Sequence, residues 1–130
     1  MTPPTLVNDI HSQLNPTWAS GIAAPRSCEE ICRMVQAARQ ARTAICVAGG
    51  RHSMGGQQFR TGALLCDMTG LNRVLHFDPA AGTVEVEAGM MWPELIAFLN
   101  DAQRGQSEPW AIAQKQTGAN RLTLGGAVSA

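Results

Sequence analysis

A glycine-rich loop over residues 49–57, Gly-Gly-Arg-His-Ser-Met-Gly-Gly-Gln, holds the residues of this sequence best suited to chemistry. Paired glycines let successive backbone N–H groups point toward one position, because no Cβ blocks the approach. Such a set of amides suits a phosphate or a pyrophosphate. The loop lacks the Gly-Lys-Ser/Thr ending of a Walker loop, and its glycine spacing differs from the dinucleotide-binding fingerprint. A phosphate-binding loop and a plain turn at the end of a strand are therefore both open interpretations.

Each polar side chain of this loop has a chemical and a structural interpretation. A neutral imidazole at His52 is a competent nucleophile near pH 7, or the ring caps a backbone carbonyl. Arg51 can balance the charge of a pyrophosphate, or it is a solvated side chain. Ser53 can donate its hydroxyl to a phosphate oxygen, or it closes a turn. Gln57 can bind a ligand or only the next turn.

Two helices are expected on either side of the loop. Ser27 followed by Glu30 is a capping-box pattern at a helix start. The apolar face of this first helix is expected to be Ile31, Met34, Val35 and Ala38. Pro93 suits the first turn of a second helix, which starts near Trp92. The residues that this helix is expected to bury are Leu95, Ile96, Phe98 and Leu99.

Short strands are expected between and around these helices. Apolar runs and turn residues predict them over 44–48, 63–68, 73–78 and 83–88. The run over 44–48 leads directly into the glycine loop. The run over 83–88 alternates cleanly, which predicts a half-exposed antiparallel strand with Glu85 and Glu87 on a solvated face. The fold class is therefore α+β, with some α/β character, and a long loop is expected from Asp101 to Asn120.

The N-terminal 23 residues carry three prolines and no sustained hydrophobic period. We expect an irregular segment over 1–23 with one short helical turn from Leu6 to Leu14. His11 in this segment, like His76 further on, is interpreted as an ordinary, partly exposed residue. Asp67 is interpreted as the cap of the turn that follows it.

Composition excludes several classes of function. Ten basic and ten acidic residues give a net charge of zero, and neither a basic face nor a charge run occurs, which argues against nucleic acid or an anionic membrane as partner. No apolar run is long enough for a transmembrane helix, and the N-terminus has no signal-peptide pattern. The cysteines, Cys28, Cys32, Cys46 and Cys66, match no zinc motif, so no metal is expected. Buried free thiols and a cytoplasmic location are expected instead.

The C-terminal run over 122–130 is apolar, contains two glycines and has no stop signal. Only 15% of the residues are charged, below the roughly 25% of an average soluble domain. Both features lead us to expect that the chain is truncated inside a structural element. We also expect a missing C-terminal part of the same protein to cover part of the surface of this chain.

Several motifs in order give the sequence a family resemblance. They are Pro25 and the capped helix, Val47–Ser53, Leu65–Asn72, Val84–Gly89 and Leu124–Ser129. Together they resemble the FAD-binding domain of the vanillyl-alcohol oxidase and para-cresol methylhydroxylase (PCMH) family, and within it most closely the sugar-lactone and polyol oxidases. The resemblance implies that residues 24–130 are the N-terminal half of a PCMH-type FAD-binding domain built from two subdomains.

The resemblance also implies a cofactor and its site. FAD would lie with its pyrophosphate on the glycine loop, and the flavin 8-methyl group would be bonded covalently to His52. Arg51 departs from the family, which often carries glycine there. The cofactor-binding residues implied are Gly49, Gly50, Arg51, His52, Ser53, Met54, Gly55, Gly56, Gln57, Thr117, Gly118, Gly125 and Gly126.

The function implied is that of an FAD-dependent oxidoreductase. The whole protein would oxidise a CH–OH group of a sugar lactone, a polyol or a similar small-molecule alcohol, with hydride passing to flavin N5. Its catalytic residues are expected outside this chain, which alone would be inactive. Two alternatives stay open: a non-catalytic, truncated nucleotide-binding module, and a dehydrogenase of the same family with non-covalent FAD.

Overall fold

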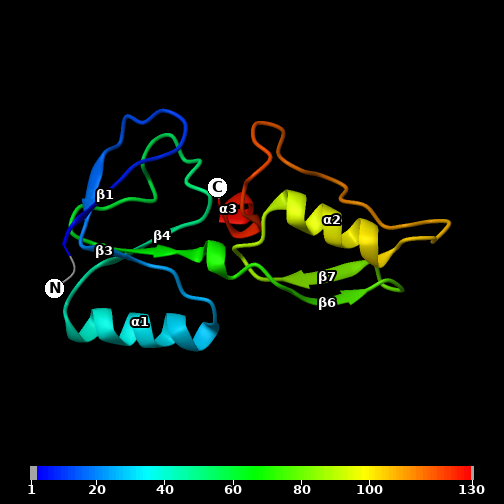
Figure 1. Ribbon diagram of the computed structural model, residues 1–130, viewed down its shortest axis with the longest axis horizontal. Coiled ribbons are helices and arrows are strands. Elements are labelled where there is room, and N and C mark those ends of the chain that lie inside the picture. Colours follow the sequence, from blue (N-terminus) through cyan, green and yellow to red (C-terminus); the bar gives the residue numbers. More distant parts are fainter. Residues whose placement is uncertain (1–2, 130) are drawn as a thin grey trace. The chain divides into compact units, whose positions relative to one another are not determined.

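The structure is a computed structural model that describes residues 3–129. The chain divides into two compact units, Met1–Leu71 and Asn72–Ala130, and each is described here by itself. Both combine helices with strands (Figure 1), so the predicted α+β class is confirmed.

The first unit is built on a parallel sheet of three strands. Its strand order is β3 (Gly21–Ala23), β5 (Leu64–Asp67) and β4 (Ile45–Ala48). Parallel neighbours need a crossover connection, and helix α1 (Cys28–Gln40) provides it between β3 and β4. Figure 1 shows α1 on the opposite side of this sheet from β1 (Thr5–Val7). The predicted strands 44–48 and 63–68 are confirmed within one residue at each end.

The N-terminal segment is not irregular, and the helical turn expected over Leu6–Leu14 is wrong. Strand β1 pairs antiparallel with β2 (Thr17–Ala19), and β3 follows one residue later. Val7 and Ala19 from these strands are buried against Ala48 and Leu65 of the parallel sheet. Each of these two strands has three residues and buries one side chain, Val7 or Ala19. Strands of that length are too short to show a hydrophobic period, so the sequence did not predict them.

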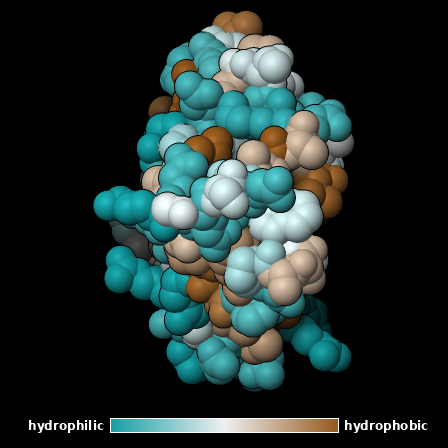
Figure 2. All heavy atoms as spheres, turned by 90° about the vertical axis from the view of Figure 1, so that its right-hand side faces the viewer, coloured by the Kyte–Doolittle hydropathy of each residue, from teal (hydrophilic) through white to brown (hydrophobic). Residues whose placement is uncertain are grey.

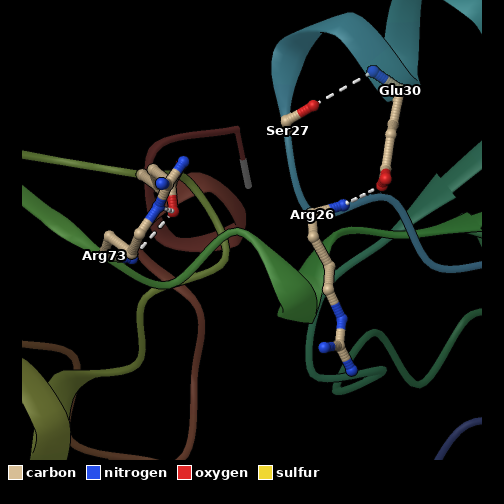
Figure 3. Close-up of polar contacts among 5 residues, drawn as sticks. Arg26, Ser27, Glu30 and Arg73 are labelled. Carbon is tan, nitrogen blue, oxygen red and sulfur yellow. Dashed lines mark hydrogen bonds and ion pairs between the residues drawn. The ribbon is translucent and has the colours of Figure 1, made fainter.

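Helix α1 begins as its capping residues predict. The Ser27 side chain accepts from the Glu30 amide at 3.2 Å, and the Glu30 carboxylate accepts from the Arg26 amide at 2.7 Å (Figure 3). Ala38 is buried, but Val35 is 47% exposed, so its predicted place on the buried face is wrong. All the cysteines are free, as expected, but only Cys66 is buried. Cys28 and Cys32 lie exposed on α1, because the helix covers the sheet with only a narrow stripe.

The second unit is a hairpin covered by a helix. Strands β6 (Val74–Asp78) and β7 (Thr83–Val86) pair antiparallel, and helix α2 (Trp92–Ala102) packs on them (Figure 1). The short helix α3 (Leu124–Ser129) follows a long loop, as predicted. The core contains Met90, Trp92, Leu95 and Leu99. Ile96 was expected in this core, but it is 37% exposed because it lies on the solvent side of α2.

Glu87 does not lie on a solvated face, so that prediction is wrong. Its side chain is 8% exposed and accepts from Arg73 at 2.7 Å from the guanidinium and 2.8 Å from the backbone amide. Arg73 is labelled in Figure 3. Hydrogen bonds from the Arg73 side chain and then from its amide lower the pKa of the Glu87 carboxyl. Glu85, in contrast, is exposed as predicted.

Figure 2 shows hydrophobic residues in small groups separated by hydrophilic ones on the face in view. Among the described residues, no helix has the length and apolar character that crossing a membrane requires.

Candidate functional site

The glycine loop follows β4 at the carboxyl end of a parallel strand, inside the first unit. Ligands of open α/β sheets bind at this end of the strands. The first part of the loop, residues 49–52, is half-buried, and Ser53, Met54, Gly55 and Gln57 are exposed. The predicted loop residues 49–57 are thus together and reach the surface.

Carbonyl groups of the loop are bound from within the protein. Arg51 O accepts from the Ile10 amide at 3.1 Å, and Met54 O accepts from Asn15 Nδ2 at 2.6 Å. Ser53 O accepts from the Gly56 amide at 3.2 Å. In a trans peptide the following N–H points opposite to the carbonyl, so these bonds turn the next amides the other way.

Several amides of the loop have no partner inside the protein. Among the hydrogen bonds of residues 3–129, none has as its donor the amide of Gly50, Arg51, Ser53, Met54 or Gly55. Backbone donors in proteins are nearly always bonded to protein or to water. These open amides, two of which (Met54 and Gly55) follow carbonyls that are bonded within the protein, are available as donors for an anion.

Arg51 adopts a left-handed backbone conformation, with φ of +59°. Non-glycine residues rarely adopt it, and it costs on the order of 1 kcal/mol. The Arg51 guanidinium lies 3.3 Å from Asp67 Oδ2 in a partly buried ion pair. Asp67 also accepts from the Thr69 amide at 3.0 Å, so its predicted role as a turn cap is confirmed. Arg51 is therefore not a solvated side chain: it joins the loop to the end of β5.

His52 contacts a second histidine. Its Nδ1 lies 2.6 Å from His11 Nε2, and the ring centroids are 4.7 Å apart. At that distance one of the two nitrogens must carry the proton and the other must accept it. His11 was interpreted as an ordinary residue, and nothing in its sequence neighbourhood marks it as a neighbour of the loop.

The second predicted set of residues lies in the second unit. Gly125 donates its amide to Ala88 O at 2.8 Å, and a Cβ there would meet the Ala88 Cβ at 2.9 Å. Gly126 donates to Thr123 Oγ1 at 3.3 Å. Thr117 and Gly118 lie in the long loop, where a Cβ on Gly118 would meet open space. Contacts of these residues with a cofactor stay a prediction.

A shallow pocket of about 220 Å³ lies in the same unit. Trp92 forms one wall and donates its indole N–H to Gln116 Oε1 at 3.2 Å. Gln116 in turn donates to Ala127 O at 3.2 Å, which ties the long loop to α3. Across the described residues, no group of three or more His, Cys, Asp or Glu side chains is placed to hold a metal ion.

The parallel sheet and the open amides of the loop at a strand end define a domain that binds an anionic ligand such as a nucleotide. The sequence matches the family model described as "FAD binding domain" over residues 19–130. The chain belongs to this family of PCMH-type FAD-binding domains, and FAD is its cofactor. None of the curated proteins matches the sequence.

Solved structures resemble the chain as well. An alkyldihydroxyacetonephosphate synthase is 30% identical over 68% of this chain, with a TM-score of 0.58. A variant of the BBE-like 1 protein of Physcomitrella patens is 28% identical over 65% of the chain, with a TM-score of 0.55. The chain spans 18% and 19% of the lengths of these two structures.

The residues of the glycine loop fit the diphosphate of FAD. The cofactor supplies two phosphates that need hydrogen-bond donors, and the open amides supply them without a side chain in the way. Gly56 has φ of +71°, and a Cβ there would meet Asn15 at 2.9 Å. The loop can therefore keep this conformation only with glycine at that position.

Proposed function

We propose that this chain forms the part of an FAD-dependent oxidoreductase that binds the FAD diphosphate. The observation that carries the proposal is a set of loop amides that donate to no group among residues 3–129, those of Gly50, Arg51, Ser53, Met54 and Gly55. A bound diphosphate would accept hydrogen bonds from these amides. The Arg51 guanidinium, 3.3 Å from Asp67, would offset part of its charge.

Titration of the chain with FAD tests this proposal. We expect the flavin fluorescence to change on binding, and we expect ADP and inorganic pyrophosphate to compete, because both carry the diphosphate. Riboflavin, which has no phosphate, should compete poorly. Equal competition by riboflavin would reject the diphosphate assignment, and absence of any response to FAD would favour the non-catalytic, truncated module.

We further propose that His52 is the residue that bonds covalently to the flavin. A ring nitrogen without a proton is nucleophilic near pH 7. In the tautomer in which His52 Nδ1 donates to His11 Nε2, a neutral His52 carries no proton on its other ring nitrogen, Nε2, and that nitrogen would be the nucleophile. A covalent bond would prevent loss of the cofactor.

Acid precipitation of the full-length protein tests the covalent bond. Yellow colour that stays with the pellet is expected for the wild type, and a His52→Ala variant should release its flavin into the supernatant. His76→Ala, which changes an exposed histidine on β6, is the matched control. If the wild type releases its colour into the supernatant, the covalent bond is rejected, and a dehydrogenase with non-covalent FAD is the interpretation that remains.

The reaction we propose is oxidation of a CH–OH group in a sugar lactone, a polyol or a similar alcohol. When bound, FAD supplies a hydride acceptor at N5 of its ring. The catalytic base and the substrate pocket would come from protein outside this chain, because the chain covers only 18% and 19% of the solved structures similar to it. Flavin bleaching by a panel of lactones and polyols under anaerobic conditions would identify the substrate class, and bleaching by none of them would reject it.

A further inference from the structure

The turn over residues 8–15 contacts the glycine loop, although it lies outside the family match, which begins at residue 19. Four of its residues reach the loop. Ile10 donates its amide to Arg51 O at 3.1 Å, and Asn15 Nδ2 donates to Met54 O at 2.6 Å. Ser12 Oγ also donates to Met54 O, at 3.3 Å, and His11 contacts His52. All of these contacts lie within the first unit.

Asp9 is the centre of this turn. It is fully buried, and one carboxylate oxygen accepts from the amides of His11 at 3.0 Å and Ser12 at 2.6 Å. The other oxygen accepts from Ser12 Oγ at 2.8 Å and Asn15 Nδ2 at 2.9 Å. The hydrogen bond from Asn15 is the main cause that lowers the pKa of this carboxyl, and those from Ser12 and His11 add to it. Asp9 therefore stays ionised and keeps all four donors in place.

The turn determines which way the loop amides face. Asn15 uses its two N–H groups for different partners: one holds Asp9 and the other holds the Met54 carbonyl. Because that carbonyl points toward the turn, the amide of Gly55 points away from it. The Ile10 amide orients the peptide after Arg51 in the same way. The absence of a Cβ on Gly56 leaves room for Asn15 to make this contact.

We propose that the turn over residues 8–15 is a positioning element of the FAD-binding loop, with Asp9 as its organising residue. The inference rests on the proposed function for what the loop binds. The Asp9 carboxylate accepts from none of the open loop amides. It fixes Asn15 and the amides of the turn, and these fix the loop carbonyls, so that the loop is arranged for the diphosphate before the cofactor arrives. Prearranged donors bind better because less ordering accompanies binding.

An Asp9→Asn variant tests this proposal. Its side-chain oxygen can still accept from the backbone amides, but its new NH2 group faces the NH2 group of Asn15. The dissociation constants for FAD and for ADP are measured well below the unfolding temperature, where far-UV circular dichroism shows both proteins folded. We expect both constants to rise about 10-fold, which corresponds to about 1.4 kcal/mol. Asp101→Asn, at an exposed position of α2, is the matched control and should leave both constants unchanged.

Amide hydrogen exchange of the chain without FAD gives a second readout. We expect the hydrogen-bonded amides at this contact, those of Ile10, Gly56 and Phe59, to exchange faster in Asp9→Asn, while those of α2 stay as in the wild type. This readout does not need a cofactor. If the wild type fails to bind FAD, the proposed function fails, yet exchange still decides whether the turn orders the loop.

An Asn15→Ala variant keeps the test decisive if Asp9→Asn does not fold. It removes both side-chain donors but no buried charge, and Asn72→Ala, at an exposed position, is its control. Faster exchange in the loop together with weaker FAD and ADP binding supports the proposal. Unchanged exchange and unchanged constants in a folded variant of either residue would overturn it.

Discussion

Glycine has different uses in the two glycine-rich regions of this chain. In the loop over 49–57 the carbonyls of Arg51, Ser53, Met54 and Gly56 are bonded inside the protein, and several amides are left open. In α3 the Gly125 amide is bonded to Ala88 O, and the missing Cβ lets the helix approach that residue. The first region thus offers backbone donors to a ligand, whereas the second uses glycine for close packing.

The difference shows that a Gly-Gly pair is not by itself a phosphate site. What distinguishes the two regions is the partner of each peptide group, and the partners come from segments distant in sequence. For the loop they come from residues 8–15, and for α3 they come from the end of β7. Substitutions in the first region should therefore change ligand binding, and those in the second should change stability.

The largest effect is expected for Gly125→Ala. Its Cβ would lie 2.9 Å from the Ala88 Cβ and 3.0 Å from the Ala88 carbonyl oxygen, and neither atom can move away freely. Overpacking of this kind costs about 3 kcal/mol of unfolding free energy. Gly118→Ala is the matched control, since its Cβ would meet open space. Urea unfolding of both variants measures the difference, and equal midpoints would contradict the packing role of Gly125.

Gly56→Ala is expected to have the next largest effect. A residue with a side chain at φ of +71° is strained, and its Cβ would meet Asn15 at 2.9 Å. Together these cost about 2 kcal/mol. Gly62→Ala has a similar φ of +75° but open space around it, so it separates strain from contact and should cost about 1 kcal/mol. FAD affinity should fall only in Gly56→Ala. If both variants bind FAD equally, the loop does not need its contact with Asn15.

Local sequence signals predicted much of this fold. The Ser27 and Glu30 pattern located the start of α1, and the alternation over 83–88 identified the paired strand β7. These signals succeed because they involve neighbours within one turn or one strand. The glycine loop was also recognised, since its composition is unusual, and the family match confirms FAD as the cofactor of the chain, although the place of the loop in the FAD site stays a prediction.

Long-range contacts account for what the sequence did not predict. The interpretation of Glu87 failed and the contact of His11 was missed, because their partners, Arg73 and His52, are 14 and 41 residues away. The buried carboxylate of Asp9 was missed for a similar reason: its burial depends on how the N-terminal strands pack. No periodicity in a short segment carries that information.

Arg51 offers a smaller and more specific test of the first region. Its φ of +59° favours glycine, so Arg51→Gly should be more stable than Arg51→Ala by about 1 kcal/mol, although both lose the ion pair with Asp67. Comparing the two variants cancels that loss. Thermal unfolding measures the difference. If the alanine variant is as stable as the glycine variant, the loop does not hold the left-handed conformation in solution.

The smallest effect is expected for the carboxylate of Glu87, the residue before Ala88, whose carbonyl oxygen accepts from Gly125. The folded-state pKa of Glu87 is lowered by its hydrogen bonds from Arg73, so its contribution to stability is fully present above the unfolded pKa of about 4.3 and is lost as pH falls through the folded value. Glu87→Gln should therefore be less stable than the wild type at pH 7, with a gap in stability that closes as the pH falls through the lowered pKa of the folded state. Glu85 lies in the same run of alternating apolar and polar residues but is exposed. Glu85→Gln should therefore differ little from the wild type in unfolding free energy at any of these pH values. Urea unfolding at several pH values measures this, and a gap that persists in acid would mean that the shape of Glu87, rather than its charge, holds the end of β7 beside Gly125.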